Sequence, residues 1–197
     1  MSTHVQAQLS SVPAAIYLTA QNSTEAANGA QDPLTATVSL FGYPYQGASI
    51  KFTESQTFPT ISPVLVNTDI NGHAQSYISS MTKGNVTVYA SFSGYNTSTV
   101  VDFVSPLSIT FAATNITGAS GAALIIDSAT YSASQLPVIV QLLPGSRHYY
   151  AYSTIIGTGS TRAITPSVSG CQQSTVTGVI VAKYNCTITA AYILNTT

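Results

Sequence analysis

Short runs of alternating apolar and polar residues recur along the chain, and this pattern constrains the fold more than any other feature. Gly, Pro, Asn or Ser separate the runs, whereas the apolar spacing typical of helices is almost absent. An alternation with period two places successive side chains on opposite faces of a sheet. The runs are also rich in β-branched residues and tyrosine, which favour strands. The sequence therefore predicts an all-β protein of sandwich architecture.

The runs fall into two groups on either side of Ser105-Pro106. The first group predicts strands at 14–20, 34–41, 48–53, 74–79, 86–91 and 98–104. The second group predicts strands at 107–113, 123–127, 138–142, 148–153, 176–183 and 187–193. A chain of 197 residues can hold one large β domain or two of about 100 residues. We expect two domains, at 13–104 and 105–197, after an N-terminal tail at 1–12.

Charged residues are scarce. They make up 6% of the chain and give a net charge of −1, whereas ordinary soluble domains contain roughly 25%. Such a composition argues against nucleic acid or an anionic membrane as a partner. Because few carboxylates can take up protons as the pH falls, we expect folding stability to depend weakly on pH. This property suits the acidic surroundings of a thermoacidophile.

Sequons are unusually frequent among the asparagines. Six of the nine asparagines stand in Asn-x-Ser/Thr, at Asn22, Asn85, Asn96, Asn115, Asn185 and Asn195. Chance would place only about two or three there. No run approaches the roughly 18 apolar residues that cross a bilayer, and Met1–Val5 lacks the basic and apolar regions of a signal peptide. We expect an extracellular protein with N-linked glycans, no other cofactor, and a signal peptide already removed.

The two cysteines, Cys171 and Cys186, lie 15 residues apart. A disulfide that closes such a loop would stabilise the fold by roughly 3 kcal/mol. Two buried free thiols would instead fit a reducing compartment, although some thermophile cytosols are an exception to that rule. We predict the disulfide.

The tail precedes the strand that begins near Ala14, which the first sandwich needs for itself. The tail nevertheless has the pattern of a strand, because Val5, Ala7 and Leu9 alternate with glutamines. A lone strand leaves its backbone unpaired, and it can satisfy those groups by joining the edge of another molecule's sheet. About 11 residues at roughly 3.3 Å each could traverse a sandwich. We therefore predict a donor strand at Val5, Ala7 and Leu9.

Ordered motifs in the first half carry a family resemblance. They are Leu34-Thr-Ala-Thr-Val38, Gly42-x-Pro44-x-x-Gly47, Thr68-Asp69-x-Asn71-Gly72 and Gly84-x-Val86-x-Val88. Over roughly residues 13–104 the chain resembles the bacterial immunoglobulin-like repeats of the intimin and invasin type. The resemblance implies an immunoglobulin-like sandwich that serves as a rigid spacer, and it carries over no catalytic residues.

The second half contains the motifs Asp127-x-x-x-Tyr131, Pro144-Gly-x-x-His148-x-Tyr150 and Ile188-x-Ala190-x-Tyr192. With these motifs it resembles β domains of surface proteins from thermophilic archaea. The whole organisation, with a strand-like tail, two β domains and many sequons, resembles the subunit of the thread filaments of Sulfolobales archaea. This resemblance implies a homopolymer in which the tail of one subunit completes the sandwich of the next.

Catalytic and metal sites are not expected. A pepsin-like site needs two Asp-Thr/Ser-Gly loops, but neither Asp69 nor Asp127 stands in one. His4, His73 and His148 have no Cys, His or carboxylate at ligand spacing and no Gly-x-Ser-x-Gly nearby. These residues are better interpreted as turn and strand residues, and we expect no enzyme.

Two further motifs have structural interpretations. The stretch Asn67-x-Asp69-x-Asn71-Gly72 imitates the front of a calcium loop, but Ile78 stands where the last acidic ligand belongs. A hairpin turn with hydrogen bonds to Asx side chains is favoured instead. The run Arg147-His-Tyr-Tyr150 could line a sugar-binding face, but strand alternation explains it at least as well.

Two hypotheses of function follow. The first is a subunit of an extracellular, pilus-like thread that polymerises head-to-tail by donor-strand complementation and supports adhesion or biofilm formation. The second is a monomeric secreted adhesin or carbohydrate-binding module, in which residues 105–197 bind surface glycans and the first domain is a stalk.

Overall fold

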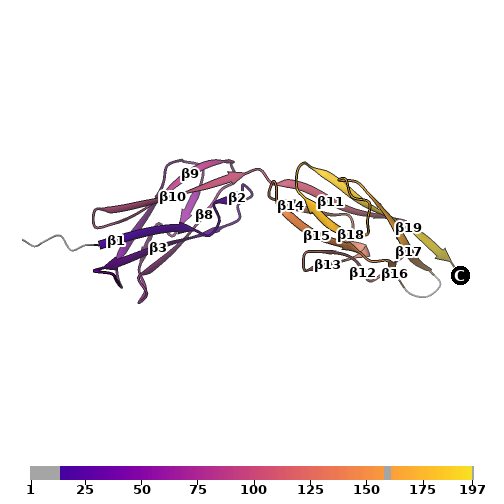
Figure 1. Ribbon diagram of the computed structural model, residues 1–197, viewed down its shortest axis with the longest axis horizontal. Helices are drawn as coiled ribbons and strands as arrows, with labels where there is room; N and C mark the ends of the chain where they lie inside the picture. Colours follow the sequence, from indigo (N-terminus) through magenta and orange to yellow (C-terminus); the bar gives the residue numbers. More distant parts are fainter. Residues whose placement is uncertain (1–13, 158–160, 197) are drawn as a thin grey trace, which may run out of the picture. The chain divides into compact units, whose positions relative to one another are not determined.

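The computed structural model describes residues 14–157 and 161–196. Apart from one short 3-10 turn, η1 (Ala133–Gln135), its regular elements are all strands, so the all-β prediction is confirmed. The chain divides between Ser105 and Pro106 into two compact units (Figure 1), which we call domain 1 and domain 2. The predicted donor residues Val5, Ala7 and Leu9 lie outside the described residues.

The first sheet of domain 1 has the strand order β1-β3-β8-β6. These strands span Ala14–Ala20, Asp32–Leu40, His73–Ser79 and Thr60–Ser62, and the short β4 (Tyr43–Pro44) pairs with the end of β3. All of these pairings are antiparallel. The strand that begins at Ala14 is therefore part of the domain's own sheet.

The second sheet of domain 1 has the order β2-β10-β9-β5-β7. Its strands span Thr24–Ala26, Tyr95–Val104, Gly84–Phe92, Ser49–Glu54 and Leu65–Asn67. β2 runs parallel to β10, and the other pairings are antiparallel. The N-terminal edge of the sandwich is thus divided, because β1 pairs in one sheet and β2 in the other.

Alternation along the strands builds the core of domain 1. On β3, Leu34, Ala36 and Val38 are fully buried, whereas the threonines between them are half-buried on the other face. The same alternation on the opposite sheet buries Ile50, Phe52, Val86, Val88 and Ala90. Fully burying one large aliphatic or aromatic side chain contributes roughly 1.5–3 kcal/mol, so the predicted period-two pattern is also the source of stability.

Domain 2 is a second sandwich. Its first sheet has the order β14-β11-β19-β17-β16. These strands span Val138–Leu142, Leu107–Thr114, Cys186–Thr196, Thr161–Ser169 and Ile155–Ile156. The first strand of the domain, β11, runs parallel to the last, β19, and antiparallel to β14.

The second sheet of domain 2 has the order β13-β12-β15-β18. Its strands span Ala129–Ser132, Ala122–Ile126, Arg147–Tyr152 and Thr177–Val181. All three pairings are antiparallel. β13 and β18 therefore form the two edges of this sheet.

β17 is a long strand that the sequence pattern did not predict. Its run contains Pro166, which has no N–H for a ladder and argues against a central strand. In the structure the register between β17 and β19 shifts between Ile164 and Ser167, so Pro166 occupies an irregularity that needs no ladder hydrogen bond. Six strands of two to four residues were also missed, since so few residues show no clear alternation: β2, β4, β6, β7, β13 and β16.

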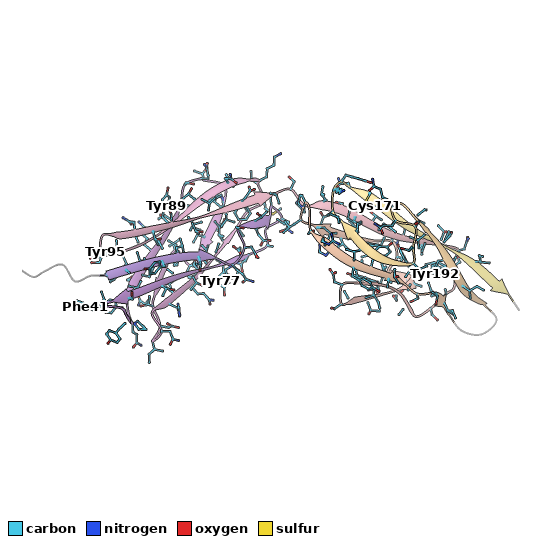
Figure 2. All side chains as sticks on the ribbon, viewed as in Figure 1. Phe41, Tyr77, Tyr89, Tyr95, Cys171 and Tyr192 are labelled. Carbon is cyan, nitrogen blue, oxygen red and sulfur yellow. A yellow bond between two sulfur atoms is a disulfide. The ribbon has the colours of Figure 1, made fainter. Side chains whose placement is uncertain are left out.

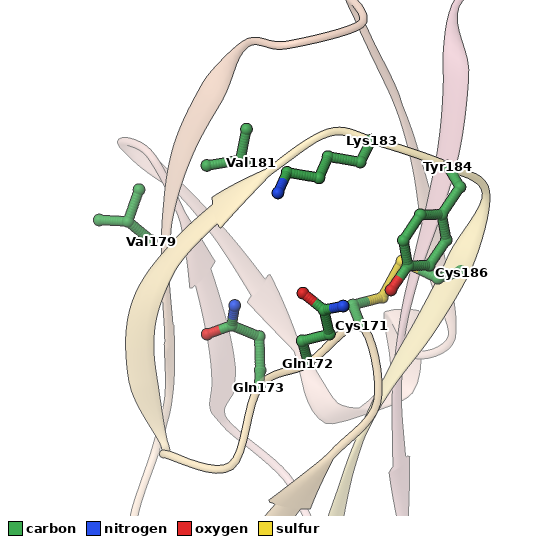
Figure 3. Close-up of a pocket in the computed structure, with 8 residues that line it drawn as sticks. All are labelled: Cys171, Gln172, Gln173, Val179, Val181, Lys183, Tyr184 and Cys186. Atoms are coloured by element: carbon green, nitrogen blue, oxygen red, sulfur yellow. A yellow bond between two sulfur atoms is a disulfide. The ribbon is translucent and has the colours of Figure 1, made fainter.

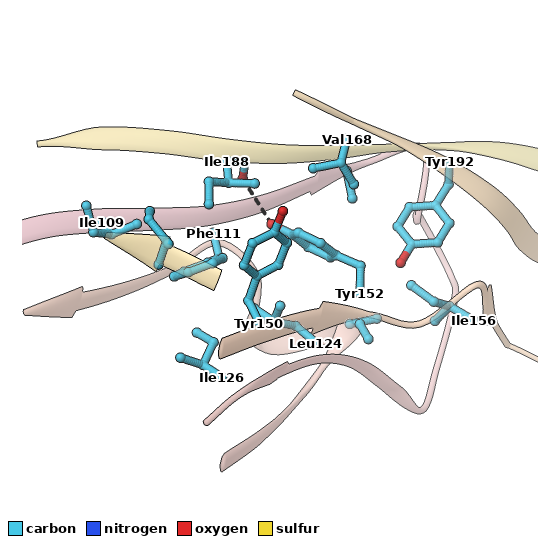
Figure 4. Packing of buried hydrophobic residues seen from close by; sticks show 14 of the residues in the cluster. Ile109, Phe111, Leu124, Ile126, Tyr150, Tyr152, Ile156, Val168, Ile188 and Tyr192 are labelled. Carbon is cyan, nitrogen blue, oxygen red and sulfur yellow. Dashed lines mark hydrogen bonds between the residues drawn. The ribbon is translucent and has the colours of Figure 1, made fainter. Parts of the chain in front are cut away.

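Tyrosines fill the core of domain 2 (Figure 4). Tyr150, Tyr152 and Tyr192 are buried, and their hydroxyls have hydrogen-bond partners. The Tyr152 hydroxyl lies 3.0 Å from the carbonyl oxygen of Ile188, and the Tyr192 hydroxyl donates to the Ser153 carbonyl at 2.7 Å. Burial raises the pKa of Tyr192 to about 12, and it also raises the pKa of Tyr152 above its usual range.

We expect domain 2 to lose stability in alkaline solution. An unfolded tyrosine loses its proton near pH 10, whereas folded Tyr192 keeps its proton until the pH reaches about 12. The stability that protonated Tyr192 adds to the fold is therefore fully present below the tyrosine pKa of the unfolded chain. It is lost as the pH rises through the Tyr192 pKa of the folded domain. The loss of stability is measured by denaturant unfolding of the unmodified protein and of Tyr192→Phe, each at about pH 8 and at about pH 11. Equal pH sensitivity of the variant would contradict this assignment.

Cys171 and Cys186 form the predicted disulfide, with an S–S distance of 2.05 Å. The bond joins the loop after β17 to the first residue of β19. Gly170, just before it, has a φ of 105°, and a Cβ at this position would collide with the carbonyl oxygen of Thr187. Glycine is therefore required where the chain passes close to β19.

Candidate functional site

The outer edge of β18 is an unpaired sheet edge in domain 2. β18 pairs only with β15. The carbonyl of Val176 and the amide of Ala182 both bond toward β15, and backbone groups alternate in direction along a strand. The amides and carbonyls of Val179 and Val181 therefore point away from the sheet. Within the described part of the chain, nothing forms a hydrogen bond with them.

A pocket of about 140 Å³ lies beside this edge. Figure 3 shows β18 on one side of the pocket and the loop with Gln172 and Gln173 on the other. The lining residues are Val179, Val181, Gln172, Gln173, Lys183, Tyr184 and the disulfide. Val179 is 44% exposed. An open edge that carries apolar side chains, with space alongside, is suited to accept an extended segment.

Exposed and partly buried aromatic side chains gather at the end of domain 1 where β1 begins. We call this surface the aromatic end and define it as Phe41, Tyr43, Tyr45, Phe92 and Tyr95. These residues come from the β3–β4 hairpin, the segment after it, and the β9–β10 hairpin. Figure 2 shows Phe41 and Tyr95 at this end. The rings of Tyr45 and Phe92 are in contact, with centroids 5.7 Å apart.

Phe41 occupies a conformation that does not suit it. It forms a two-residue turn with Gly42, and both residues have positive φ, 51° and 81°. An L residue in this left-handed region costs about 1–2 kcal/mol, and asparagine is the usual first residue of such a turn. Yet 64% of Phe41 is exposed, as is 75% of Tyr43. The folded domain therefore gains little from this ring to offset the strain of its backbone.

The described sequon asparagines all lie at the surface. Asn85 and Asn96 are exposed on β9 and β10, and Asn185 is exposed in the loop before β19. For Asn85 and Asn96 no side-chain hydrogen bond is formed with any described residue, and Asn185 uses only its Oδ1, which accepts from the Ser108 amide. Their Nδ2 atoms, which N-glycosylation modifies, are accessible. The side chain of Asn195 lies outside the described part.

Asn22 and Asn115 are exposed, but their side-chain amides already act as donors. The Asn22 Nδ2 donates to Asp32 Oδ1 at 3.0 Å and to Glu25 at 3.1 Å. The Asn115 Nδ2 donates to the Tyr192 carbonyl at 2.9 Å. Asp32 is buried, and burial raises its pKa above the usual range. These two sequons therefore have structural roles that Asn85 and Asn96 lack.

The loop that imitates a calcium site is a turn, as predicted. Asp69 Oδ1 accepts hydrogen bonds from the amides of Asn71 and His73, at 2.8 and 2.9 Å. The His73 amide, with a smaller contribution from Asn71, holds the pKa of Asp69 below its usual range. Because its side chain caps the turn, Asp69 is accounted for without a cation.

The structure brings together three residues that the sequence left apart. His148 Nδ1 lies 2.8 Å from Asp127 Oδ2, and His148 Nε2 lies 2.9 Å from the Ser146 hydroxyl. Antiparallel pairing of β12 with β15 places the turn at Asp127 beside His148. No carboxylate stands at ligand spacing from His148 in the sequence, but His148 is not isolated in the fold, because Asp127, 21 residues away in sequence, lies beside it.

This chain of contacts resembles a Ser–His–Asp triad in connectivity but differs from it in its hydrogen bonding. The Ser146 hydroxyl donates to the Leu143 carbonyl at 2.6 Å, within the turn before β15. Its proton is thus directed away from His148, whereas a nucleophile must donate to the base. The hydrogen bond from His148 lowers the pKa of Asp127. The arrangement ties two turns together, and this tie weakens as the pH falls and Asp127 takes up a proton.

Alternation also accounts for the neighbouring run of aromatic residues. Arg147 and Tyr149 are exposed on one face of β15, whereas Tyr150 is buried in the core and His148 is half-buried. The strand interpretation of this run is confirmed. Over residues 14–157 and 161–196, no three His, Cys, Asp or Glu side chains gather as metal ligands. Nor does this part of the chain contain a helix long and apolar enough to span a membrane.

Comparison with solved structures finds fragments of intimin and a Yersinia adhesin. The D00-D0 domain of intimin is 25% identical over 45% of this chain and 46% of that chain, with a TM-score of 0.42. A C-terminal intimin fragment, solved with the intimin-binding domain of its translocated receptor, is 17% identical over 93% and 64%, with a TM-score of 0.46. The Yersinia pseudotuberculosis adhesin InvE is 13% identical over 88% and 49%, with a TM-score of 0.41. The chain spans less than two thirds of each.

Comparison with protein families gives a match in domain 1. No protein of curated function matches the chain. The family model of the bacterial immunoglobulin-like domain (group 1) matches residues 15–104. This range contains β1 to β10 almost entirely, and the match supports the resemblance found in the ordered motifs. Residues 15–104 therefore form a domain similar to the bacterial immunoglobulin-like domains of group 1.

Proposed function

We propose that this protein is a non-catalytic structural subunit of an extracellular filament, a pilus-like thread on the cell surface. It polymerises head-to-tail by donor-strand complementation and supports adhesion or biofilm formation. The observation that carries this proposal is the unpaired edge of β18, with its apolar side chains and adjacent pocket. The donor is the tail at 1–12, with the apolar row Val5, Ala7 and Leu9.

Domain 1 does not need the tail for its own sheets. β1 begins at Ala14 and pairs with β3 along its whole length, and β2 supplies the parallel partner of β10. The described strands thus pair with one another, and the proposal assigns the tail to another molecule. Paired with β18, the tail would form hydrogen bonds with the outward amides and carbonyls of Val179 and Val181. These backbone groups would then no longer be unpaired at the sheet edge.

The chemistry of the surface supports an extracellular setting. The disulfide suits an oxidising compartment. The exposed sequons at Asn85, Asn96 and Asn185 offer attachment points for glycans, which would keep a surface with few charges in solution. The similarity of domain 1 to bacterial immunoglobulin-like domains fits a rigid spacer with a mechanical role.

Val179→Pro tests the acceptor edge. The amide of Val179 points outward, so proline removes a donor strand's partner and leaves the hydrogen bonds to β15 in place. We expect the variant to fold, with a circular dichroism spectrum like that of the parent, and to form no filaments in negative-stain electron micrographs at acidic pH.

Val179→Thr is the matched control, since it keeps the amide and the β-branched shape, and it should polymerise. Filaments of normal length from Val179→Pro would exclude β18 as the acceptor. Discrete elongated monomers from the unmodified protein would instead favour the monomeric adhesin, in which residues 105–197 bind a glycan.

A further inference from the structure

We infer that the aromatic end of domain 1 is a self-association surface that packs against a second copy of this chain. This inference rests on the proposed function. It adds a second contact between successive subunits, made by folded surfaces and separate from the strand exchange between the tail and β18.

The path of the chain brings a partner to this surface. A groove of about 370 Å³ crosses the aromatic end, and Ala14 lines it together with Leu40, Tyr45, Phe92, Ser93 and Tyr95. The described chain therefore begins at this groove. Only Pro13 lies between the tail and Ala14, so an extended chain would separate residues 12 and 14 by roughly 7 Å. Any domain that binds the tail is held beside the aromatic end at high effective concentration.

The residue types fit a contact between proteins. Phe41 and Tyr43 are largely exposed, and Tyr45 is more than one third exposed. Tyrosine and other aromatic residues are enriched at interfaces, where they bury a large area. The tyrosine hydroxyl can also form hydrogen bonds with water at the edge of the interface. None of the residues that line the groove is charged, so its burial against a second copy leaves no charge without a partner.

The surface is held in place before any partner arrives. The Tyr45 amide donates to the Val38 carbonyl at 3.0 Å, and the Tyr45 carbonyl accepts from the buried Thr68 hydroxyl at 2.6 Å. Gly72 packs so tightly here that a Cβ would collide with the Val38 carbonyl. Because the backbone is already ordered, association loses little conformational freedom.

A second copy is favoured over a soluble glycan as the occupant. Sugar and small-molecule sites place several polar groups around the ligand. Here the polar side chains that line the groove are Ser93 and the two tyrosine hydroxyls. Binding of a polysaccharide at this surface would give a different experimental result, so the test below includes it.

The double variant Phe41→Asn with Tyr43→Ser, in the full-length protein, tests the inference. Asparagine suits the positive φ at position 41 better than phenylalanine, so the monomer should melt no lower than the parent. The concentration of free subunit in equilibrium with filaments, measured by sedimentation, should rise by about 30-fold or more, the effect of losing one interface hot spot. Tyr89→Ser, an exposed aromatic on β9, is the control and should leave it unchanged.

Each result has a definite meaning. Assembly of the double variant at the parent's concentration would overturn the inference, while Val179→Pro would still report on the proposed function. Normal assembly together with loss of binding to purified cell-surface polysaccharide would assign the aromatic end to glycans and also overturn it. If the unmodified protein stays monomeric at all concentrations, the proposed function fails and this inference fails with it.

Discussion

Deletion of residues 2–12 is expected to leave a folded monomer that forms no filaments at any concentration. The deletion ends before Ala14, where β1 begins, so it leaves every described core residue in place. It removes the whole predicted donor strand. Without that strand, a neighbouring subunit has no segment that can pair with the open edge of β18. Electron microscopy and sedimentation of the truncated protein measure the loss.

A peptide with the sequence of residues 1–12 provides the complementary measurement. When added in excess to the unmodified subunit, it should occupy the acceptor edge, shorten the filaments, and raise the melting temperature of domain 2 by mass action. A peptide of the same composition in scrambled order should do neither. Filaments from the truncated protein would show that strand donation is not the basis of assembly.

Phe111→Ala is expected to destabilise domain 2 by about 3–5 kcal/mol, the range for a buried phenylalanine replaced by alanine. Phe111 is fully buried on β11. Its ring lies 5.9 Å from that of Tyr150 and 6.5 Å from that of Tyr152. The truncation would also remove the ring that packs against both tyrosines. For a domain of this size each kcal/mol lowers the melting temperature by about 4–8 °C.

Hydrogen exchange followed by mass spectrometry can locate this effect within the full-length chain. Amides of β11, β15 and β19 should lose protection, while β3, β8 and β9 keep it, because the two cores share no residues. Ile139→Ala, on the neighbouring strand β14, is the control. Ile139 is 62% exposed, so its truncation should cost less than about 0.5 kcal/mol. Loss of protection in both domains would show that they unfold as one unit.

The candidate sites differ in how far the sequence could predict them. The exposure of Asn85 and Asn96 follows from alternation within their own strands, which is a local property. The disulfide followed from there being only two cysteines. By contrast, the contact between Asp127 and His148 depends on the pairing of β12 with β15, which no local pattern specifies. The edge of β18 is likewise open only because of its place in the sheet order.

The aromatic end is a further case of a site that only folding assembles. Phe41 and Tyr43 belong to one hairpin, and Phe92 and Tyr95 belong to another about 50 residues later in the sequence. In sequence the tyrosines are scattered, and nothing in their spacing singles out those of the aromatic end. The two hairpins lie at the same end of domain 1 because β1 pairs with β3 and also contacts β10. The turn at Phe41-Gly42 carried a local signal in its glycine, but the positive φ of Phe41 appears only in the structure.

The sequence by itself determined the all-β class, most strands, the turns and the asparagines at the surface. These features depend on the residues near them, because alternation and turn chemistry act over a few positions. The tertiary structure alone decided the sheet order, the bulge that admits Pro166 into β17, the open edge of β18, and the grouping of aromatic side chains at one end of domain 1. Those features depend on which strands pair, and pairing is set by cores assembled from residues far apart in the chain.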